Sequence, residues 1–514
     1  MTLPSRSLVR ACAPSRFLGL LGLCVGVLLG SSAPARAQGS APQPDAAPAA
    51  EPALAPVAPA PPPWNTAPRP DEASGITRAE PTPLSHHLRW VPRVLLFVPR
   101  WAIWVAAQPI RLGVWAYQHY NVPERFEYAL FNVDDTGIRP VARYGLYPIV
   151  TYESGFGING GLRFLHKDLG GEGERLRLKA NFGGRFRQAY GFSLGSGKRF
   201  GDRVKLDLGG LYERRPKERF FGIGNADEVD VAELPMQIDP MTSEAAVDTR
   251  FREHMWRVIL TADVPLIDAF GLRMSTALTA RRFGRAGDDD DVSIEQAYDV
   301  DRLVGFQEGV DNLYTELELY YDTRRPTSPY QSKVMDATGW LLSGHLGVTT
   351  GVAGDPSDFV RYGADLQRYF DLYKGSRVLA LRLLVEAVGG SDGRTDGAIS
   401  FIDLPRLGGA EVMRGYPSGR YRDRSVSVAT AEYSWDLGNF LAAYTFVDVG
   451  RAWRSLRDVE IDDSLRMGFG GGIQFHTNAA FVMRGQVAVS RDGDCFLDLV
   501  LSPAFGRRER AGRF

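Results

Sequence analysis

Between residues 313 and 322 the sequence reads Leu-Tyr-Thr-Glu-Leu-Glu-Leu-Tyr-Tyr-Asp. Its side chains alternate between two sets, Leu313, Thr315, Leu317, Leu319 and Tyr321 in one and Tyr314, Glu316, Glu318, Tyr320 and Asp322 in the other. Because successive side chains of a β-strand point to opposite faces, this alternation predicts a strand with one largely apolar face and one largely charged face. The same pattern recurs in residues 175–182 and 465–476.

Alternation of this kind extends over the chain from residue 141 onward. Sixteen alternating segments begin near residues 141, 156, 173, 186, 202, 252, 268, 311, 335, 357, 376, 425, 439, 464, 480 and 496. Bacterial outer-membrane barrels have an even number of antiparallel strands, with apolar side chains toward lipid and polar ones toward the lumen. The pattern therefore predicts an all-β fold, a 16-stranded antiparallel transmembrane β-barrel.

The lengths of the connections support this fold. Links after odd-numbered strands are long, at residues 214–251, 283–310 and 390–424, and links after even-numbered strands are short, around Leu266, Tyr373, Gly438 and Asn478. The link at residues 323–333 is a partial exception. Long external loops that alternate with short periplasmic turns are typical of membrane barrels. We therefore expect a location in the bacterial outer membrane, with the N- and C-termini in the periplasm.

Composition limits the alternatives. A soluble β-sandwich or soluble barrel also alternates apolar and polar side chains, but long strands and a signal peptide favour the membrane. A formal net charge of −1 gives no electrostatic basis for binding nucleic acid. Three cysteines, of which only Cys495 lies beyond the N-terminal region, are too few for a disulfide framework or a cysteine zinc cluster.

The region before the barrel divides into three segments. Residues 1–37 combine early arginines, an uncharged stretch and the sequence Ala-Arg-Ala at their end, which predicts a secretory signal peptide. Residues 38–84 are rich in Pro and Ala and predict a disordered linker. Residues 85–139, rich in Trp and Arg, predict an amphipathic helical segment that either packs against or plugs a larger body or lies in the membrane interface. The barrel is expected at residues 140–505, followed by a basic C-terminal tail at residues 506–514.

A motif lies in the long connection between the eleventh and twelfth predicted strands. Residues 408–424 read Gly-Gly-Ala-Glu-Val-Met-Arg-Gly-Tyr-Pro-Ser-Gly-Arg-Tyr-Arg-Asp-Arg. This segment resembles the sixth-loop motif of the BamA/TamA family of outer-membrane assembly barrels, the bacterial surface antigen family, whose core is matched by Arg414, Gly415 and Tyr416. Further segments resemble the same family, namely Phe-Val-Asp-Val-Gly at residues 446–450, Tyr-Asp-Thr-Arg at 321–324 and Phe-Gly-Ile-Gly-Asn at 221–225. The resemblance covers roughly residues 140–505.

The resemblance implies how the loop is held. In this family the loop arginine reaches back into the lumen and pairs with the strand aspartate, here Arg414 and Asp448. Phe446 and Gly450 complete the strand motif, and Glu432 on the twelfth strand is a second candidate partner. A guanidinium inside a narrow lumen needs a carboxylate and can stack on an aromatic ring. The alternative is that Arg414 tips a solvated loop.

Two features concern the ends of the barrel. The last predicted strand carries Leu497, Leu499, Leu501 and Phe505 on one face, and we interpret Leu499, Leu501 and Phe505 as a C-terminal signal for insertion of the barrel itself. The family's periplasmic POTRA domains, which receive clients by β-strand addition, have no room between Ala37 and residue 140. This difference puts a role as a general insertase in question.

Function follows from the resemblance rather than from any chemical motif. It implies that the barrel aids insertion of outer-membrane proteins or protein translocation, with client membrane or secreted proteins, outer-membrane lipid and lipopolysaccharide as partners. The alternative is a pore-forming or structural outer-membrane barrel without an assembly role. We find no nucleophile elbow, phosphate-binding loop or zinc-ligand spacing, so we expect no enzymatic activity, no catalytic residues, no metal and no cofactor. The acidic run at residues 288–291 is expected to be a solvated loop, or alternatively a weak site for divalent cations.

Overall fold

The computed structural model describes residues 144–514 except for residues 235–236, 242–244, 288–290, 327–335, 353, 391–398, 439–440, 461–463, 477–480, 504, 507–509 and 511–514. The predicted signal peptide (1–37), linker (38–84) and amphipathic helical segment (85–139) lie outside the described residues, as does most of the acidic run at 288–291. No helix within the described ranges is both long enough and apolar enough to cross a membrane.

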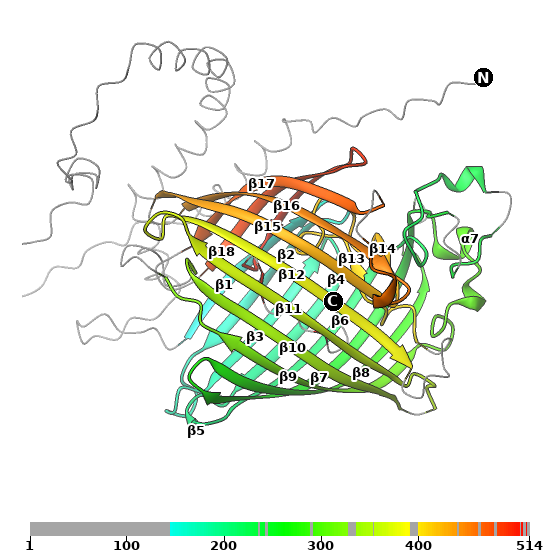
Figure 1. Ribbon diagram of the computed structural model, residues 1–514. Coiled ribbons are helices and arrows are strands. Elements are labelled where there is room, and N and C mark those ends of the chain that lie inside the picture. The colour runs from blue at the N-terminus through cyan, green and yellow to red at the C-terminus, as the bar shows by residue number, and fades with distance from the viewer. Residues whose placement is uncertain are drawn as a thin grey trace, which may run out of the picture. The chain divides into compact units, whose positions relative to one another are not determined.

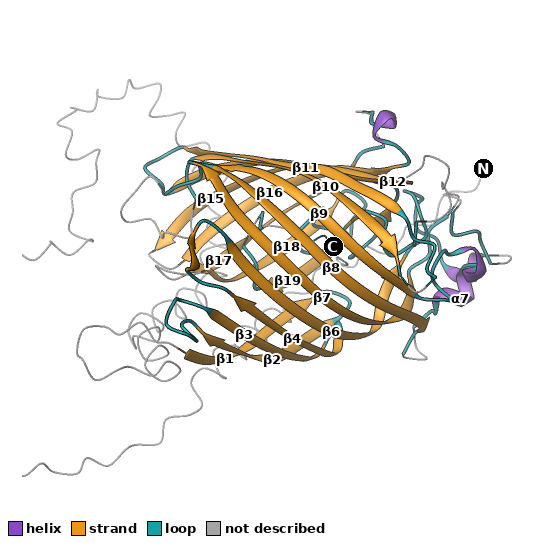
Figure 2. Ribbon diagram, turned by 90° about the horizontal axis from the view of Figure 1, so that it is seen from below, coloured by secondary structure: helices purple, strands orange, loops and turns teal. Residues whose placement is uncertain are grey.

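Sixteen antiparallel strands of the described chain form a closed barrel (Figures 1 and 2), which confirms the predicted fold. Each strand pairs with its neighbours along the chain, and the last strand closes the ring against the first. The strands are β1 (Tyr144–Glu153), β2 (Gly157–His166), β3 (Arg175–Gly183), β4 (Phe186–Gly195), β6 (Lys205–Phe220), β7 (Thr249–Ile267), β8 (Phe270–Arg285), β9 (Val310–Asp322), β10 (Gly339–Gly351), β11 (Phe359–Asp371), β12 (Arg377–Gly390), β15 (Ser425–Gly438), β16 (Leu441–Trp453), β17 (Arg466–His476), β18 (Phe481–Ser490) and β19 (Cys495–Val500). Each begins within a few residues of its predicted start.

The two faces of the strands differ as the alternation predicts for a membrane barrel. On β9, Leu317 and Leu319 are 47% and 50% exposed on the outside, whereas Glu316 and Glu318 are buried on the inside. This arrangement is the inverse of a soluble barrel, because the apolar belt faces lipid and the charged residues face one another across the lumen.

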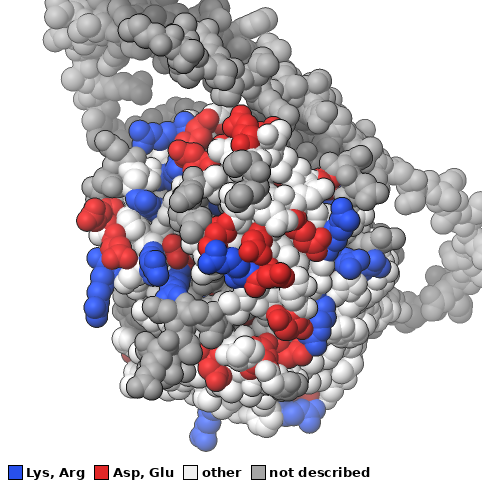
Figure 3. All heavy atoms as spheres, turned by 90° about the vertical axis from the view of Figure 1, so that its right-hand side faces the viewer, with Lys and Arg blue, Asp and Glu red and all other residues white. Residues whose placement is uncertain are grey.

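The three predicted long loops are all present and leave the same end of the barrel, because each follows an odd-numbered barrel strand. They connect β6 to β7, β8 to β9 and β12 to β15. They carry three short helices and a two-stranded sheet, namely η1 (Val231–Glu233), α7 (Ile294–Ala297), η2 (Val300–Arg302), β13 (Arg406–Leu407) and β14 (Tyr421–Arg422). We call this the loop end; it lies at the right in Figure 1. Its surface carries interspersed acidic and basic side chains (Figure 3). Two short elements lie in other connections, β5 (Arg199–Asp202) and η3 (Leu456–Asp458).

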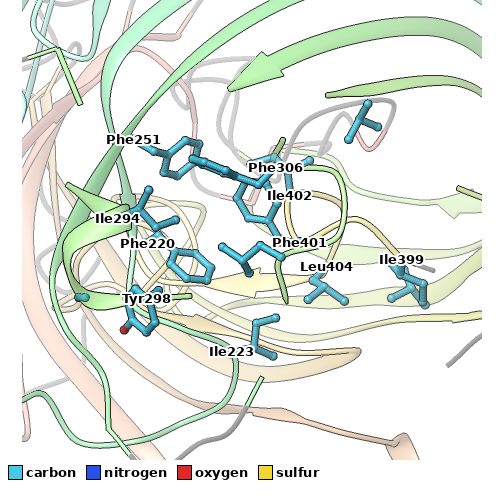
Figure 4. Packing of buried hydrophobic residues seen from close by; sticks show 14 of the residues in the cluster. Phe220, Ile223, Phe251, Ile294, Tyr298, Phe306, Ile399, Phe401, Ile402 and Leu404 are labelled. Atoms are coloured by element: carbon cyan, nitrogen blue, oxygen red, sulfur yellow. The ribbon is translucent and has the colours of Figure 1, made fainter. Parts of the chain in front are cut away.

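The largest apolar cluster of the described residues joins strand ends and long loops at the loop end (Figure 4). Phe401 packs edge-on against Phe220, Phe251 and Phe283 with ring centroids 5.0 to 5.8 Å apart. Ile294 and Tyr298, in and beside α7, are fully buried in the same cluster. The long loops are therefore packed together rather than solvated individually, which the sequence pattern did not predict.

The junction between β1 and β19 differs from its neighbours. Among the described residues, one pair, Tyr152 with Leu499, is aligned across it. By contrast, β1 and β2 are aligned without interruption from Tyr144–His166 to Glu153–Gly157. The Ser154 hydroxyl adds a bond at one end of the junction, donating to the Leu497 carbonyl at 2.9 Å. The barrel is thus closed, and this seam is its least paired junction.

Candidate functional site

The candidate site is formed by the sixth loop, residues 391–424, of which 399–424 are described. The short hairpin of β13 and β14 holds the base of the loop, and its tip turns sharply through residues with left-handed backbone. Two backbone bonds fix the tip, from Gly408 N–H to the Val412 carbonyl at 3.0 Å and from Gly409 N–H to the Tyr416 carbonyl at 2.9 Å. The motif residues are therefore presented by a folded loop.

Arg414 makes a two-pronged ion pair with Asp448 on β16. Its Nε donates to Oδ2 at 2.8 Å and its Nη2 donates to Oδ1 at 2.9 Å. The backbone N–H of Arg414 donates to the same carboxylate at 2.9 Å, and the Thr430 hydroxyl does so at 2.8 Å. Both charged residues are almost completely buried. The Asp448 carboxylate therefore accepts four hydrogen bonds, which compensate for its burial. Two of them come from the forked guanidinium of Arg414.

Glu432 on β15 is the second partner of the loop arginine. Its Oε2 accepts hydrogen bonds from Arg414 Nη1 at 2.6 Å and from Arg484 Nη2, on β18, at 3.1 Å. The Arg414 guanidinium also lies over the Phe446 ring, 3.5 Å from the centroid. Burial alone would lower the pKa of Arg414, but the charge of Asp448 and the hydrogen bonds raise it above its ordinary value. Two arginines thus face two carboxylates, and the buried charges balance.

Glycines let the loop lie directly on the barrel wall. A Cβ on Gly468 of β17 would lie 1.7 Å from the Arg414 carbonyl oxygen. Gly415 has a φ of +92°, and a Cβ there would lie 2.7 Å from the Val489 carbonyl oxygen of β18. Within the wall, Gly450 of β16 is close-packed against β15, since a Cβ there would lie 2.5 Å from the Ser427 carbonyl oxygen. Only glycine fits these contacts between backbones.

Contacts of Tyr416 and of the loop between β6 and β7 complete the attachment of the sixth loop to the wall. Tyr416 donates to the Met467 carbonyl at 3.2 Å, and its ring packs edge-on against Tyr421 at 5.3 Å. Asn225, from the Phe-Gly-Ile-Gly-Asn segment, donates to the Ala452 carbonyl at 2.7 Å and accepts from its N–H at 3.1 Å. The N–H of Gly224 donates to the Arg422 carbonyl at 2.7 Å. The sixth loop is therefore held between the wall and the other long loops.

The structure brings together the loop and strand residues that the sequence singled out, and it adds others. Arg484 and Thr430, which the sequence analysis missed, share the carboxylates of Glu432 and Asp448. The available signal was their inward-facing position on predicted strands, which alone does not identify a partner. All four charged groups are paired, so the arrangement acts as a latch between the loop and the wall. Among the described residues, no group of three or more His, Cys, Asp or Glu could hold a metal ion.

The expected C-terminal face needs a correction. β19 ends at Val500, so Leu499 lies on the strand while Leu501 and Phe505 lie beyond it. Phe505 is buried in a cluster with Ala337, Tyr369, Val378 and Ala380 instead of continuing the outer face. Pro503 cannot donate to a strand ladder, and Phe505 has a left-handed φ of 56°, so the chain leaves the sheet. The role of these residues as an insertion signal remains a prediction.

An apolar outer belt around a charged lumen that contains a latched loop defines the class, an outer-membrane β-barrel. Residues 272–494 match the family model described as the Omp85 superfamily domain. The matched region runs from β8 to the end of the β18–β19 turn and includes the sixth loop and Asp448. It confirms the resemblance that the motifs indicated.

Three solved structures align with this chain at low identity. BamA from Haemophilus ducreyi lacking POTRA domains 1–3 has 13% identity and a TM-score of 0.48, covering 74% of this chain and 77% of that one. CdiB from Acinetobacter baumannii has 11% identity and a TM-score of 0.42, covering 70% and 59%. CdiB from Escherichia coli has 10% identity and a TM-score of 0.43, covering 72% and 66%. This chain therefore spans about two thirds or less of each CdiB chain. No curated protein matches the sequence.

Proposed function

We propose that this protein inserts or translocates client proteins at the outer membrane by opening its wall between β1 and β19. The observation that carries the proposal is the seam, where Tyr152 and Leu499 are the one aligned pair among the described residues. Opening it breaks few hydrogen bonds, whereas the neighbouring junctions have continuous ladders. An open seam presents two strand edges, and unpaired edges accept further strands. A client strand is the partner that fits such an edge.

The sixth-loop latch supports this proposal, because it stiffens the wall next to the seam. Arg414 connects the loop to β15 through Glu432 and to β16 through Asp448. Arg484 extends the connection to β18. Movement is then concentrated at β19 and β1, and the rest of the wall keeps its register. The Arg-Gly-Tyr motif acts in this proposal as a positioning element and not as a contact with the client.

The same proposal places the molecule in its membrane. The exposed apolar residues of the strands, such as Leu146, Leu162 and Leu317, are suited to contact outer-membrane lipid and the acyl chains of lipopolysaccharide. Long loops at one end favour an orientation with the loop end outside and both termini in the periplasm. We assign the protein no enzymatic activity in this role.

The test is a reversible disulfide across the seam. The variant Tyr152→Cys/Leu499→Cys, in a Cys495→Ser background, joins an aligned pair whose side chains share a face. Val447→Cys/Phe469→Cys is the matched control, since it joins an aligned, outward-facing pair of β16 and β17. In proteoliposomes, we expect oxidation of the seam pair to stop insertion of an added barrel substrate and reduction to restore it. Unchanged insertion by the oxidised seam variant would refute the proposal.

A luminal cavity of about 310 Å³, lined by charged residues that include Arg273, Asp322 and Asp365, favours a second candidate, a pore. A depletion experiment combined with bilayer recordings distinguishes the assembly role from the pore. If other outer-membrane proteins keep their abundance after depletion and the purified chain conducts, the pore replaces the assembly role.

A further inference from the structure

Arg510 follows the last strand and lies in the lumen. Its Nε and Nη2 donate to the two carboxylate oxygens of Glu316 on β9, each at 2.7 Å. Nη2 also lies 3.3 Å from Oε1 of Glu318. In the sheet order, equal numbers of strands separate β9 from β19 in the two directions around the barrel. The chain end that leaves at the seam is therefore bound to the opposite wall.

Three contacts mark the path of this end across the lumen. The Ser502 hydroxyl is hydrogen-bonded to Glu411 at the tip of the sixth loop. The Phe505 ring fills an apolar pocket formed by Ala337, Tyr369, Val378 and Ala380. The Gln367 side chain donates to the Phe505 carbonyl at 3.3 Å, and the Arg382 guanidinium lies 5.5 Å from the ring centroid. From here on, the tail means residues 501–510, which begin before the basic segment predicted at residues 506–514. Residues 504 and 507–509 of the tail are not described.

The carboxylates of β9 form a site that requires a cation. Glu316 is 3% exposed, and its other hydrogen bond comes from the Tyr314 hydroxyl at 2.5 Å. Glu318 is equally buried and shares Arg273 with Asp263. A buried carboxylate that loses its cationic partner must be hydrated or bind another cation, so loss of the Arg510 guanidinium leaves Glu316 open to water or to a replacement cation. The cavity of about 310 Å³ beside Arg510 and Phe505 provides room for exchange.

We propose that Glu316, Glu318 and the pocket of Tyr369, Val378 and Ala380 form a luminal binding site for an extended basic peptide, and that the tail is its resident ligand. The peptide that fits carries an aromatic residue and an arginine five positions later, as Phe505 and Arg510 do. The site and its occupant belong to this chain, so the proposal does not depend on whether the barrel inserts proteins or conducts solutes. A tethered ligand has an effective concentration in the millimolar range, so it excludes weaker free peptides and yields to stronger ones.

The first test measures binding of a defined probe, a fluorescent peptide with the sequence of residues 501–514. The receptor is the detergent-folded chain lacking residues 501–514, so that neither Phe505 nor Arg510 of the chain occupies the site, and fluorescence anisotropy reports binding. We expect saturable binding to this truncated chain and at least tenfold weaker binding to the full chain, whose tail occupies the site. An Arg510→Ala peptide and the Glu316→Gln/Glu318→Gln receptor should each bind about tenfold or more weakly, because each loses a charge-assisted hydrogen bond. A scrambled peptide of equal charge should bind no better than the Arg510→Ala peptide.

Equal binding of the matched, scrambled and Arg510→Ala peptides would overturn the proposal, because it would indicate attraction by charge alone. Absence of binding to a truncated chain that keeps its heat-shifted gel mobility would overturn it as well. A second measurement uses the full chain and needs no truncation. Trypsin should release residues 511–514 at least tenfold faster from Glu316→Gln/Glu318→Gln than from the unaltered chain, and equal rates would contradict the proposed site.

Discussion

Two arginines enter the lumen of this barrel from segments outside the sheet, and they are held differently. Arg414 reaches its partners from the sixth loop and binds carboxylates on β15 and β16, the strands that follow the loop. Arg510 reaches β9 on the opposite wall from the end of the chain. Both guanidinium groups are buried and both make a two-pronged contact with one carboxylate.

The difference lies in what surrounds the two ion pairs. Asp448 receives four donated hydrogen bonds, and the Arg414 backbone lies against Gly468 with no room for a Cβ. Among the described residues, Arg510 is not packed against the wall in this way. A cavity lies beside it, and Phe505 and Ser502 anchor the tail. The same chemical pair can therefore serve as a fixed latch or as an exchangeable contact, depending on the packing around it.

The largest effect is expected from Asp448→Ala. It leaves Arg414 and the Thr430 hydroxyl without their main acceptor, and breaking a buried ion pair from one side costs about 3–5 kcal/mol. The measurement is the urea midpoint of the folded barrel, followed by gel mobility without boiling. Arg414→Ala should cost a similar amount, and the double variant should add little to either single change. Strictly additive losses would show that the two residues act independently.

A smaller effect is expected from Gly468→Ala, which keeps every charge. Its new methyl group collides with the Arg414 carbonyl oxygen, so loop or strand must move, at a cost of about 1–3 kcal/mol for overpacking. Gly160→Ala is the matched control, because no atom lies within 4 Å of a Cβ there. Equal urea midpoints for the two variants would mean that the loop does not lie against β17 in solution.

The smallest effect on stability is expected from Arg510→Ala. Removing the guanidinium enlarges the cavity beside Arg510, so water can reach the Glu316 carboxylate and the loss should be about 1 kcal/mol, near that of an ordinary hydrogen bond. The urea midpoint again measures the change, with Asp448→Ala in parallel. A loss as large as that of Asp448→Ala would remove the distinction between the two contacts.

The sequence predicted the barrel well because its signal is repeated on every strand. Alternation located β9 and β17, and long loops after odd-numbered strands located the loop end. The pairing of Arg414 with Asp448 followed from a family motif and not from periodicity. Arg484 faces the lumen as alternation requires, but only the three-dimensional structure places it on Glu432.

The tail and the packed loops lay beyond prediction for a physical reason. Arg510 and Glu316 are 194 residues apart, and the tail has no periodic pattern that would assign it to a wall. Phe505 was placed on the outer face because it continues the spacing of Leu499 and Leu501. That spacing applies only while the chain remains a strand, and β19 ends at Val500.

Hydrogen exchange on the folded full chain, read by mass spectrometry, compares the two contacts most directly. The amides of Gly408, Gly409 and Arg414 are bonded inside the loop or to Asp448, so they should be protected as strongly as those of β15 and β16. The amides of the tail should exchange faster, and adding the peptide of residues 501–514 should accelerate them further without changing the loop. Equal protection of loop and tail, unaffected by the peptide, would contradict the account of one fixed and one exchangeable contact.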